Sequence, residues 1–174
     1  RGQPVGRIGL SGFTAFPHVH VSVRKDGAVI DPMTGQKAGS ACKPSGKGLW
    51  SESARQQLQS ATAALLQTGF AGGPVTSSEV MKNKVRRPAE NGPLVFFAVF
   101  INLQPGDRIE LEVSSPEGVY AQSKTDPLVR PKATYSAYAG RKSGIPAGVT
   151  VTGTARLFRA GRVIIEKTGV EFSL

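Results

Sequence analysis

Apolar and polar positions alternate in several segments of this 174-residue chain, a pattern typical of β-strands that bury one face. The segment 18–24 is the clearest case, because valines at positions 19, 21 and 23 share one face of the predicted strand. Polar side chains, including His18 and His20, share the other face. We therefore expect the valines to face a hydrophobic core and the two histidines to lie side by side.

A hairpin and a linker are predicted to follow this strand. Asp26-Gly27 is a strong signal for a two-residue turn, and the returning strand over 28–30 should end at Asp31-Pro32. Residues 34–50 are rich in Gly, Ser and Lys and show no periodicity, so we expect a linker or boundary loop there.

A short helix is expected after the linker. Ser53 to Gln56 matches a capping box, which predicts a helix that begins near Ser53. Helical spacing of apolar residues continues toward Gly69, but the stretch 63–70 could equally be a first strand of the next unit. Both interpretations of that stretch stay open at this point.

The remainder of the chain is predicted to be β-structure. A continuous apolar run over 94–103 is followed by an alternating strand over 108–113, and Gly153 marks a position prone to a β-bulge. Further strands are expected from Tyr120, over 133–138, over 149–157 and over 163–172. About six or seven short strands in this length are typical of an immunoglobulin-like β-sandwich. The expected fold class is all-β, with one short helix between its two parts.

Composition supports a folded protein with an anionic partner. Apolar residues make up 39% and charged residues 20% of the chain, and 22 basic against 12 acidic residues give a net charge of +10. Nucleic acid is disfavoured as the partner, since the basic residues are scattered and no aromatic and Gly signature of RNA binding accompanies them. An anionic cell envelope, or simply a basic soluble surface, fits equally well. The basic residues at 82–87 could contact envelope polymers, but a solvated edge strand also explains them.

The two histidines are the candidate metal-binding residues. Side chains two positions apart on a strand can address one point, as a metal site requires, although a solvated strand face would also accommodate them. No apolar run is long enough to span a membrane, and the chain starts without Met or a signal segment, so we expect it to begin within a longer protein.

The segment 5–32 resembles the C-terminal end of the catalytic domain of LytM/lysostaphin-type zinc metallopeptidases, which cleave peptidoglycan cross-links. The family shows a Gly-rich loop, a Pro-His-x-His strand, a basic turn with Asp-Gly and a closing Asp-Pro in this order. The matching positions here are Val5-Gly6, Gly9, Ser11-Gly12, Thr14, Pro17-His18-Val19-His20-Val21, Arg24-Lys25-Asp26-Gly27 and Asp31-Pro32.

The resemblance implies a role for each histidine. His20 would be a zinc ligand, and His18 would be the catalytic neighbour that manages a proton or stabilises the oxyanion. The family's other ligands, in a His-x-x-x-Asp segment, and a further catalytic His would lie before Arg1. A single imidazole leaves about three zinc positions unfilled, so we expect the zinc site to be incomplete in these residues and the segment by itself to be inactive.

The rest of the chain is similar to the β-sandwich extensions of bacterial envelope peptidases of this kind. The expected organisation is a peptidase segment over 1–34, a linker with a short helix over 35–69, and a β-sandwich over 70–174. The resemblance also implies that Cys42, the only cysteine, pairs with a cysteine of the catalytic part in an oxidising periplasm. A free thiol is the alternative.

Two functions follow as expectations. The first is a zinc metalloendopeptidase that is periplasmic or secreted and hydrolyses peptide cross-links of peptidoglycan. The alternative is a catalytically inert LytM-like envelope protein that binds or regulates cell-wall hydrolases, because Phe16 and Ser22 stand where the family usually has Gly and Glu. The expected partners are peptidoglycan or another anionic envelope polymer, and an envelope protein.

Overall fold

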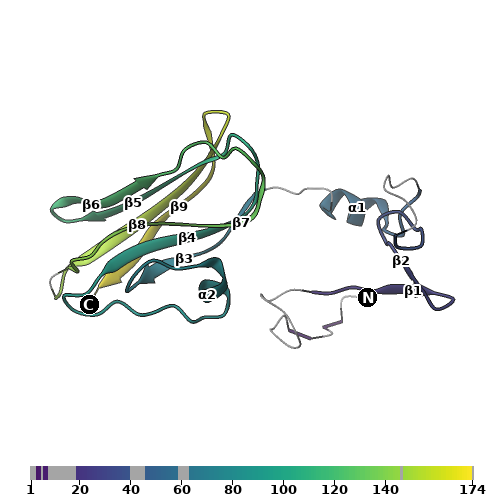
Figure 1. Ribbon diagram of the computed structural model, residues 1–174, viewed down its shortest axis with the longest axis horizontal. Coiled ribbons are helices and arrows are strands. Elements are labelled where there is room, and N and C mark those ends of the chain that lie inside the picture. The colour runs from purple at the N-terminus through teal and green to yellow at the C-terminus, as the bar shows by residue number, and fades with distance from the viewer. Residues whose placement is uncertain are drawn as a thin grey trace. The chain divides into compact units, whose positions relative to one another are not determined.

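The computed structural model describes residues 3–4, 6–7, 19–39, 46–58, 63–145 and 147–173. Within these ranges the chain forms nine strands in three antiparallel sheets and two short helices, which confirms the all-β prediction (Figure 1). The chain divides into two compact units, Arg1–Ala61 and Thr62–Leu174.

The first unit contains the predicted hairpin. Strands β1 (Val23–Lys25) and β2 (Ala28–Ile30) pair with each other, and Asp26 and Gly27 both have positive φ, at 48° and 76°. Two positive φ angles define a type I′ turn, whose twist matches that of the paired strands. The hairpin prediction is confirmed.

The predicted strand over 18–24 is too long. Pairing begins only at Val23, opposite Ile30, and residues 19–22 lie outside any strand. The register explains the difference, since the next positions would place Ser22 opposite Asp31 and Val21 opposite Pro32. Proline has no N–H to donate to a strand partner, so the ladder ends there.

Helix α1 (Glu52–Leu58) confirms the predicted short helix but not its predicted cap. The Ser51 hydroxyl accepts a hydrogen bond from the Ala54 N–H at 3.3 Å, so the N-cap is Ser51 rather than Ser53. The open question over 63–70 is settled in favour of strand, because β3 spans Ala64–Ala71.

The second unit is a sandwich of seven strands in two antiparallel sheets. One sheet has the order β3-β4-β7 and the other β6-β5-β8-β9. Besides β3, the strands are β4 (Leu94–Leu103), β5 (Arg108–Ser115), β6 (Gly118–Lys124), β7 (Lys132–Arg141), β8 (Thr150–Arg159) and β9 (Arg162–Ser173). In constant-type immunoglobulin domains the fourth strand joins the sheet of the first, second and fifth. Here the fourth strand, β6, pairs with β5 instead, because only Pro116 and Glu117 separate the two.

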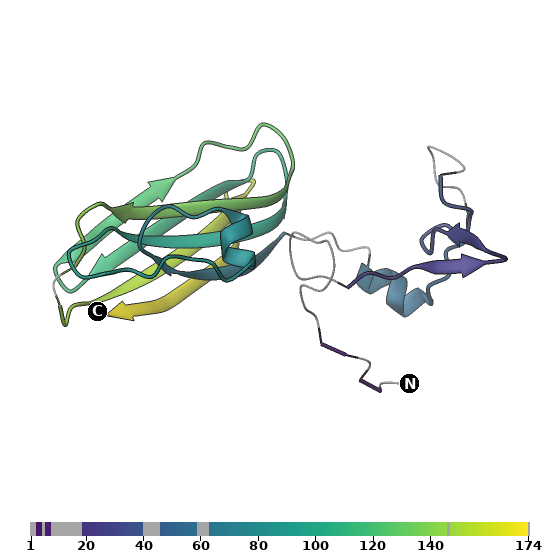
Figure 2. The ribbon, with the colours of Figure 1, turned by 60° about the horizontal axis from the view of Figure 1, so that its bottom comes forward.

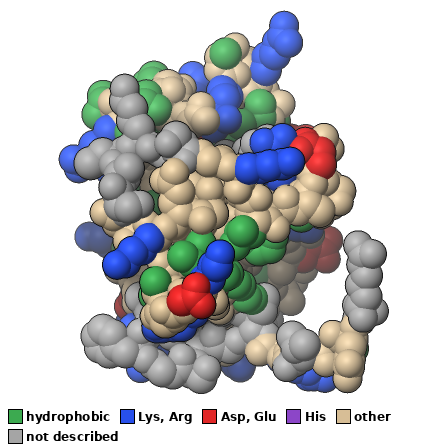
Figure 3. Space-filling model, turned by 90° about the vertical axis from the view of Figure 1, so that its right-hand side faces the viewer, with side chains coloured by type: hydrophobic (Ala, Val, Ile, Leu, Met, Phe, Trp, Pro, Cys, Tyr) green, Lys and Arg blue, Asp and Glu red, His purple; other side chains and the backbone are tan. Residues whose placement is uncertain are grey.

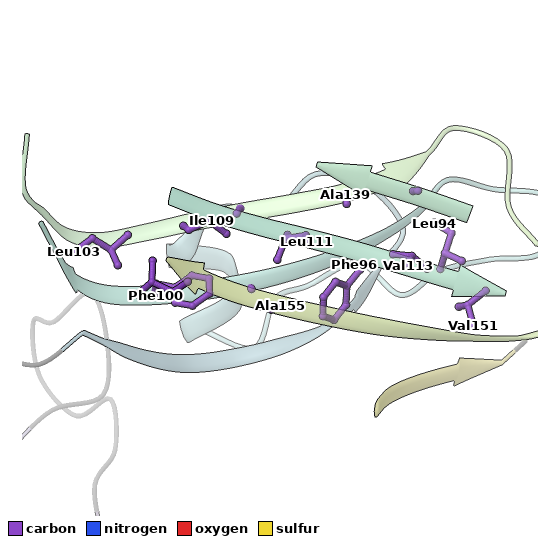
Figure 4. Packing of buried hydrophobic residues seen from close by; sticks show 14 of the residues in the cluster. Leu94, Phe96, Phe100, Leu103, Ile109, Leu111, Val113, Ala139, Val151 and Ala155 are labelled. Carbon is purple, nitrogen blue, oxygen red and sulfur yellow. The ribbon is translucent and has the colours of Figure 1, made fainter. Parts of the chain in front are cut away.

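Strand β4 is buried on both faces, which explains its continuous apolar sequence. Residues 94–100 are all at most 6% exposed. Leu94, Phe96 and Phe100 point between the sheets, where they meet side chains from β5 and β8 (Figure 4). Phe97 and Val99 point the other way and pack with Val80 of helix α2 (Ser77–Met81). Figure 2 shows this short helix lying against the three-stranded sheet.

Helix α2 is held by a capping box that the sequence pattern left unpredicted. The Thr76 N–H donates to the Glu79 carboxylate at 2.8 Å, and the Glu79 N–H donates to the Thr76 hydroxyl at 3.2 Å. The hydrogen bond from the Thr76 backbone, with that from its hydroxyl, lowers the pKa of Glu79. A hydrogen bond between the hydroxyls of Ser77 and Ser136 ties the helix to β7.

An ion pair between the buried Asp107 and the partly exposed Arg159 holds the turn that follows the C-terminal end of β4. Asp107 is fully buried in the turn after β4, and its two carboxylate oxygens each accept a hydrogen bond from the Arg159 guanidinium at 2.8 Å. The Gln104 N–H donates to the same carboxylate at 2.8 Å. Burial raises the pKa of Asp107, but the hydrogen bonds from Arg159 and Gln104 outweigh it and lower the pKa below its ordinary value of 3.8.

Replacement of Asp107 by Asn should lower the free energy of unfolding by about 2–3 kcal/mol at neutral pH, because Arg159 loses its charged partner. Because the pKa of Asp107 is lower in the folded than in the unfolded protein, its charged carboxylate stabilises the fold at pH values above the unfolded-state pKa. This stabilisation is lost as the pH falls through the folded-state pKa. The wild type should therefore lose stability below about pH 4 more steeply than the variant. Urea unfolding between pH 2 and 7 measures both effects, and parallel pH curves would contradict this account.

Replacement of Gly153 by Ala should destabilise the sandwich by about 1–3 kcal/mol, since a Cβ atom there would lie 2.5 Å from the Phe96 ring. The expected bulge is present, because the pairing of β8 with β9 shifts between Gly153 and Ala155. In a double-mutant cycle, Phe96→Leu should recover part of the loss. Additive losses in urea unfolding would show that the two residues do not clash.

Candidate functional site

His20 lies just before the β1–β2 hairpin with its side chain exposed. His18, Phe16, Cys42 and most of the Gly-rich loop lie outside the described residues, so the proximity of His18 to His20 stays a prediction. Ser22 is described and is also exposed. Of the two predicted site residues, the structure therefore places His20 alone.

The predicted burial of the valines is wrong for two of the three. Val19 and Val21 are 67% and 55% exposed, and only Val23 is partly buried. Both exposed valines precede the paired part of the hairpin, and the hydrophobic clusters of the described residues do not include them. The apolar face that the sequence pattern predicts thus has no covering layer among the described residues.

A tight turn at Asp31 follows the second strand of the hairpin. The Asp31 carboxylate accepts hydrogen bonds from the Met33 N–H at 2.8 Å and from the Thr34 hydroxyl at 3.1 Å. Its backbone carbonyl accepts from the Gly35 N–H at 2.8 Å. These bonds turn the chain immediately after β2, as expected for Asp followed by Pro.

The predicted linker is folded in its described part. Gly46 and Gly48 lie so close to the turn that a Cβ atom on either would meet the carbonyl oxygens of Thr34 or Met33, at 2.3 and 2.6 Å. The Leu49 N–H donates to the Pro32 carbonyl at 2.9 Å. The high glycine content therefore reflects close backbone packing against the Asp31 turn, not the freedom of a linker.

The described residues do not by themselves form a zinc site. Among them, no group of three or more His, Cys, Asp or Glu side chains could hold a metal ion. His20 offers one imidazole, whereas zinc takes about four ligands. Any zinc site that uses His20 needs ligands from beyond the part of the chain described.

Figure 3 shows Lys and Arg side chains at several separate places on the visible face. The residues at 82–87 are not an edge strand, because β3 and β7 are the edges of that sheet. Residues 84–87 run as an irregular segment that contacts the end of β3, where the Gly72 N–H donates to the Arg86 carbonyl at 2.8 Å.

Three arginines lie near the last hairpin, at positions 156, 159 and 162, and two of them form ion pairs. Arg159 pairs with Asp107, and Arg156 pairs with Glu166 at 2.6 Å. Across the four-stranded sheet, the register places Lys124, Glu110, Arg156 and Glu166 in one row. Lys124 and Glu110 are paired at 3.1 Å, so charges alternate along this row.

A small pocket lies at the end of the sandwich where β5 turns into β6 and β7 ends. It has a volume of about 230 Å³ and is lined by Pro116, Glu117, Tyr120, Arg141, Ile145 and Val149, among others. The Arg141 guanidinium stacks on the Tyr120 ring at 5.0 Å, and the Tyr120 hydroxyl donates to the Ser143 carbonyl. Burial raises the pKa of Tyr120 against the opposing effect of Arg141, which keeps the phenol a neutral donor. Nothing in the strand pattern signals this pocket, because its residues come from three separate segments.

A comparison of the chain with models of protein families finds no match, and a comparison with curated proteins finds none either. In the part of the chain that the structure describes, no helix has the length and apolar character needed to cross a membrane. A functional assignment therefore has to rest on the residues of this chain.

Replacement of Asp31 by Ala should loosen the turn next to the hairpin. Losing both side-chain acceptors costs about 1 kcal/mol, so amide exchange at Met33 and Gly35 should accelerate about fivefold. Asp31→Asn keeps one acceptor and should give a smaller change. Hydrogen exchange measured by NMR decides the matter, and protection in Asp31→Ala equal to that of the wild type would contradict it.

Proposed function

We propose that this chain is the C-terminal portion of a zinc metalloendopeptidase that hydrolyses peptide cross-links of bacterial peptidoglycan. The observation that carries the proposal is the order of features around His20. An exposed histidine of the Pro-His-x-His segment directly precedes a type I′ Asp-Gly hairpin, which an Asp-Pro turn closes. The family shows the same order of motifs.

In this proposal His20 is one zinc ligand of the parent enzyme, and His18 is its catalytic neighbour. The remaining ligands come from a part of the enzyme beyond this chain, so the segment alone has no peptidase activity. The exposed Val19 and Val21 support this view, because an alternating strand normally buries its apolar face against a second layer. The rest of the catalytic domain would supply that layer.

The second candidate is an inert LytM-like protein that binds or regulates cell-wall hydrolases. Ser22 favours it, since this exposed hydroxyl stands where the family commonly has a carboxylate. Phe16 next to the histidine pair favours it as well. The presence of the upstream His-x-x-x-Asp ligands in the full-length protein separates this candidate from an active peptidase.

The charge of the chain fits a periplasmic or secreted protein that meets an anionic wall. Net charge +10 favours association with anionic polymers, and an envelope protein is a further possible partner. In the described part of the sandwich, Lys82, Lys84, Arg86 and Arg87 have no carboxylate within ion-pair distance and are available for such contacts.

Replacement of His20 by Ala in the full-length protein should abolish zinc-dependent hydrolysis of wall peptides, with activity reduced at least about a thousandfold. Loss of one ligand should also lower the zinc content measured by atomic absorption. Because the His20 side chain is exposed, the fold should not change, and the zinc-free forms of the variant and the wild type should have the same melting temperature.

The matched control is Ser22→Ala, which alters another exposed side chain of the same segment and should leave zinc content unchanged. Equal activity and zinc content in His20→Ala and in the wild type would exclude His20 as a ligand. A full-length wild type that lacks both zinc and hydrolysis would favour the inert protein.

A further inference from the structure

We propose that the pocket at Tyr120 and Arg141 binds the carboxyl-terminal end of a short peptide with small apolar side chains. The assignment of such ends to wall peptides rests on the proposed function, whereas the chemistry of the pocket does not. Three features of the pocket support the proposal, namely a cation held against an aromatic ring, an apolar wall and a limited volume.

The cation is Arg141, an exposed side chain that a cation–π contact holds against the Tyr120 ring before any ligand binds. Its guanidinium stacks on the Tyr120 ring at 5.0 Å, and the hydrogen bond from Tyr120 to the Ser143 carbonyl holds that ring in place. Stacking occupies the face of the guanidinium and leaves the N–H donors at its rim free. Among the described residues, no carboxylate lies within ion-pair distance of Arg141. A planar guanidinium with free donors is suited to a carboxylate bound through two hydrogen bonds.

The apolar wall lies beside this cation. Pro116, Ile145 and Val149 line the same pocket, and Ile145 is only 3% exposed. Burial of a methyl or similar side chain against them would contribute roughly 25 cal/mol per Å² of apolar area. The pocket therefore offers a carboxylate site next to an apolar site, as the last residue of a peptide requires.

The volume limits what can enter. A pocket of about 230 Å³ is smaller than the sites of about 300–1,000 Å³ that hold drug-sized ligands. A second, more open hollow of about 410 Å³ shares Tyr120 and Arg141 and runs between the edge strands β6 and β7. The last residue of a peptide fits the first hollow, and the preceding residue can lie in the second.

Glu117 sets the charge of the ligand. Its carboxylate lines the same pocket and makes no ion pair with Arg141 in the described structure. A ligand with a second acidic group would meet this charge and bind less well, whereas a free amino group would be attracted to it. The pocket therefore favours peptide ends with a single carboxylate.

The test is an NMR titration of the intact 174-residue chain with alanyl-alanine, in its L,L and D,D forms. We expect binding in the millimolar range, with shifts at Tyr120, Gly144 and Ile145. The C-terminal amide of the dipeptide should bind at least about tenfold more weakly, since it has no carboxylate. Butyrate, a carboxylate without a peptide bond, serves as the probe for fatty acids, and binding as tight as that of the dipeptide would overturn the peptide assignment.

Arg141→Gln should weaken binding of the dipeptide at least about tenfold and make the acid and its amide equivalent. Arg141→Lys should restore only part of the affinity, because an ammonium cannot offer two parallel donors. The matched control is Lys142→Gln, which removes the same charge from the next residue, outside the pocket lining. Equal losses in the Arg141 and Lys142 variants would reveal a general charge effect and overturn the site.

Failure of this proposal is distinguishable from failure of the proposed function. Dipeptide binding that is unaffected by Arg141→Gln overturns the pocket assignment, whatever the activity of the full-length enzyme. Hydrolysis that is unaffected by His20→Ala overturns the zinc assignment, whatever the pocket binds. The two experiments use different variants and different readouts.

Discussion

The burial of β4 on both faces is the constraint on which the sandwich depends. A strand in the middle of an antiparallel sheet commonly exposes one face to solvent, whereas both faces of β4 are buried. Its inner face requires the four-stranded sheet, and its outer face requires α2 and the irregular segment after it. The capping box of α2 and the hydroxyl contact with β7 therefore secure the cover of a strand that could not otherwise remain in water.

Three carboxylates of the sandwich form ion pairs that join its strands. Asp107 forms an ion pair with Arg159, Glu110 pairs with Arg108 and Lys124, and Glu166 pairs with Arg156. The basic residues outnumber these acidic partners, so surplus cations remain, among them Arg141 at the end of β7 and Lys167 within β9. This distribution accounts for the large net charge and spreads it over several segments of the described chain. It also places Arg141 at a strand end, where a ligand can reach it.

Most strands of the sandwich were predictable because they have a local signature, whereas the residues of β3 fitted a helix equally well. The run at 94–103, the alternation of Ile109, Leu111 and Val113, and the turn at Ala160-Gly161 each predict their element from neighbouring residues alone. Helix α2 was missed because five residues show no helical periodicity, although Thr76 and Glu79 formed a readable capping box.

How far each candidate site could be predicted also depended on whether its signal lies in neighbouring residues of the sequence. The hairpin after His20 has a local signal in Asp26-Gly27, whereas the early end of β1 depends on the missing donor of Pro32, several residues away. The exposure of Val19 and Val21 could not be predicted, because a strand pattern shows that a face is apolar but not whether a layer covers it. The pocket at Tyr120 and Arg141 is assembled by the fold from distant segments, so no local pattern contains it.

The alternating row across the four-stranded sheet also has a consequence for how the sheet assembles. Its members come from β6, β5, β8 and β9, so correct charge pairing requires all four strands to be aligned at once. If β8 slipped by two residues against β5, Arg156 could come to lie opposite Arg108, and like charges would repel. Hydrophobic faces alone would tolerate such a slip, because it keeps every side chain on its own face. The surface charges thus disfavour misaligned sheets that the hydrophobic core would tolerate.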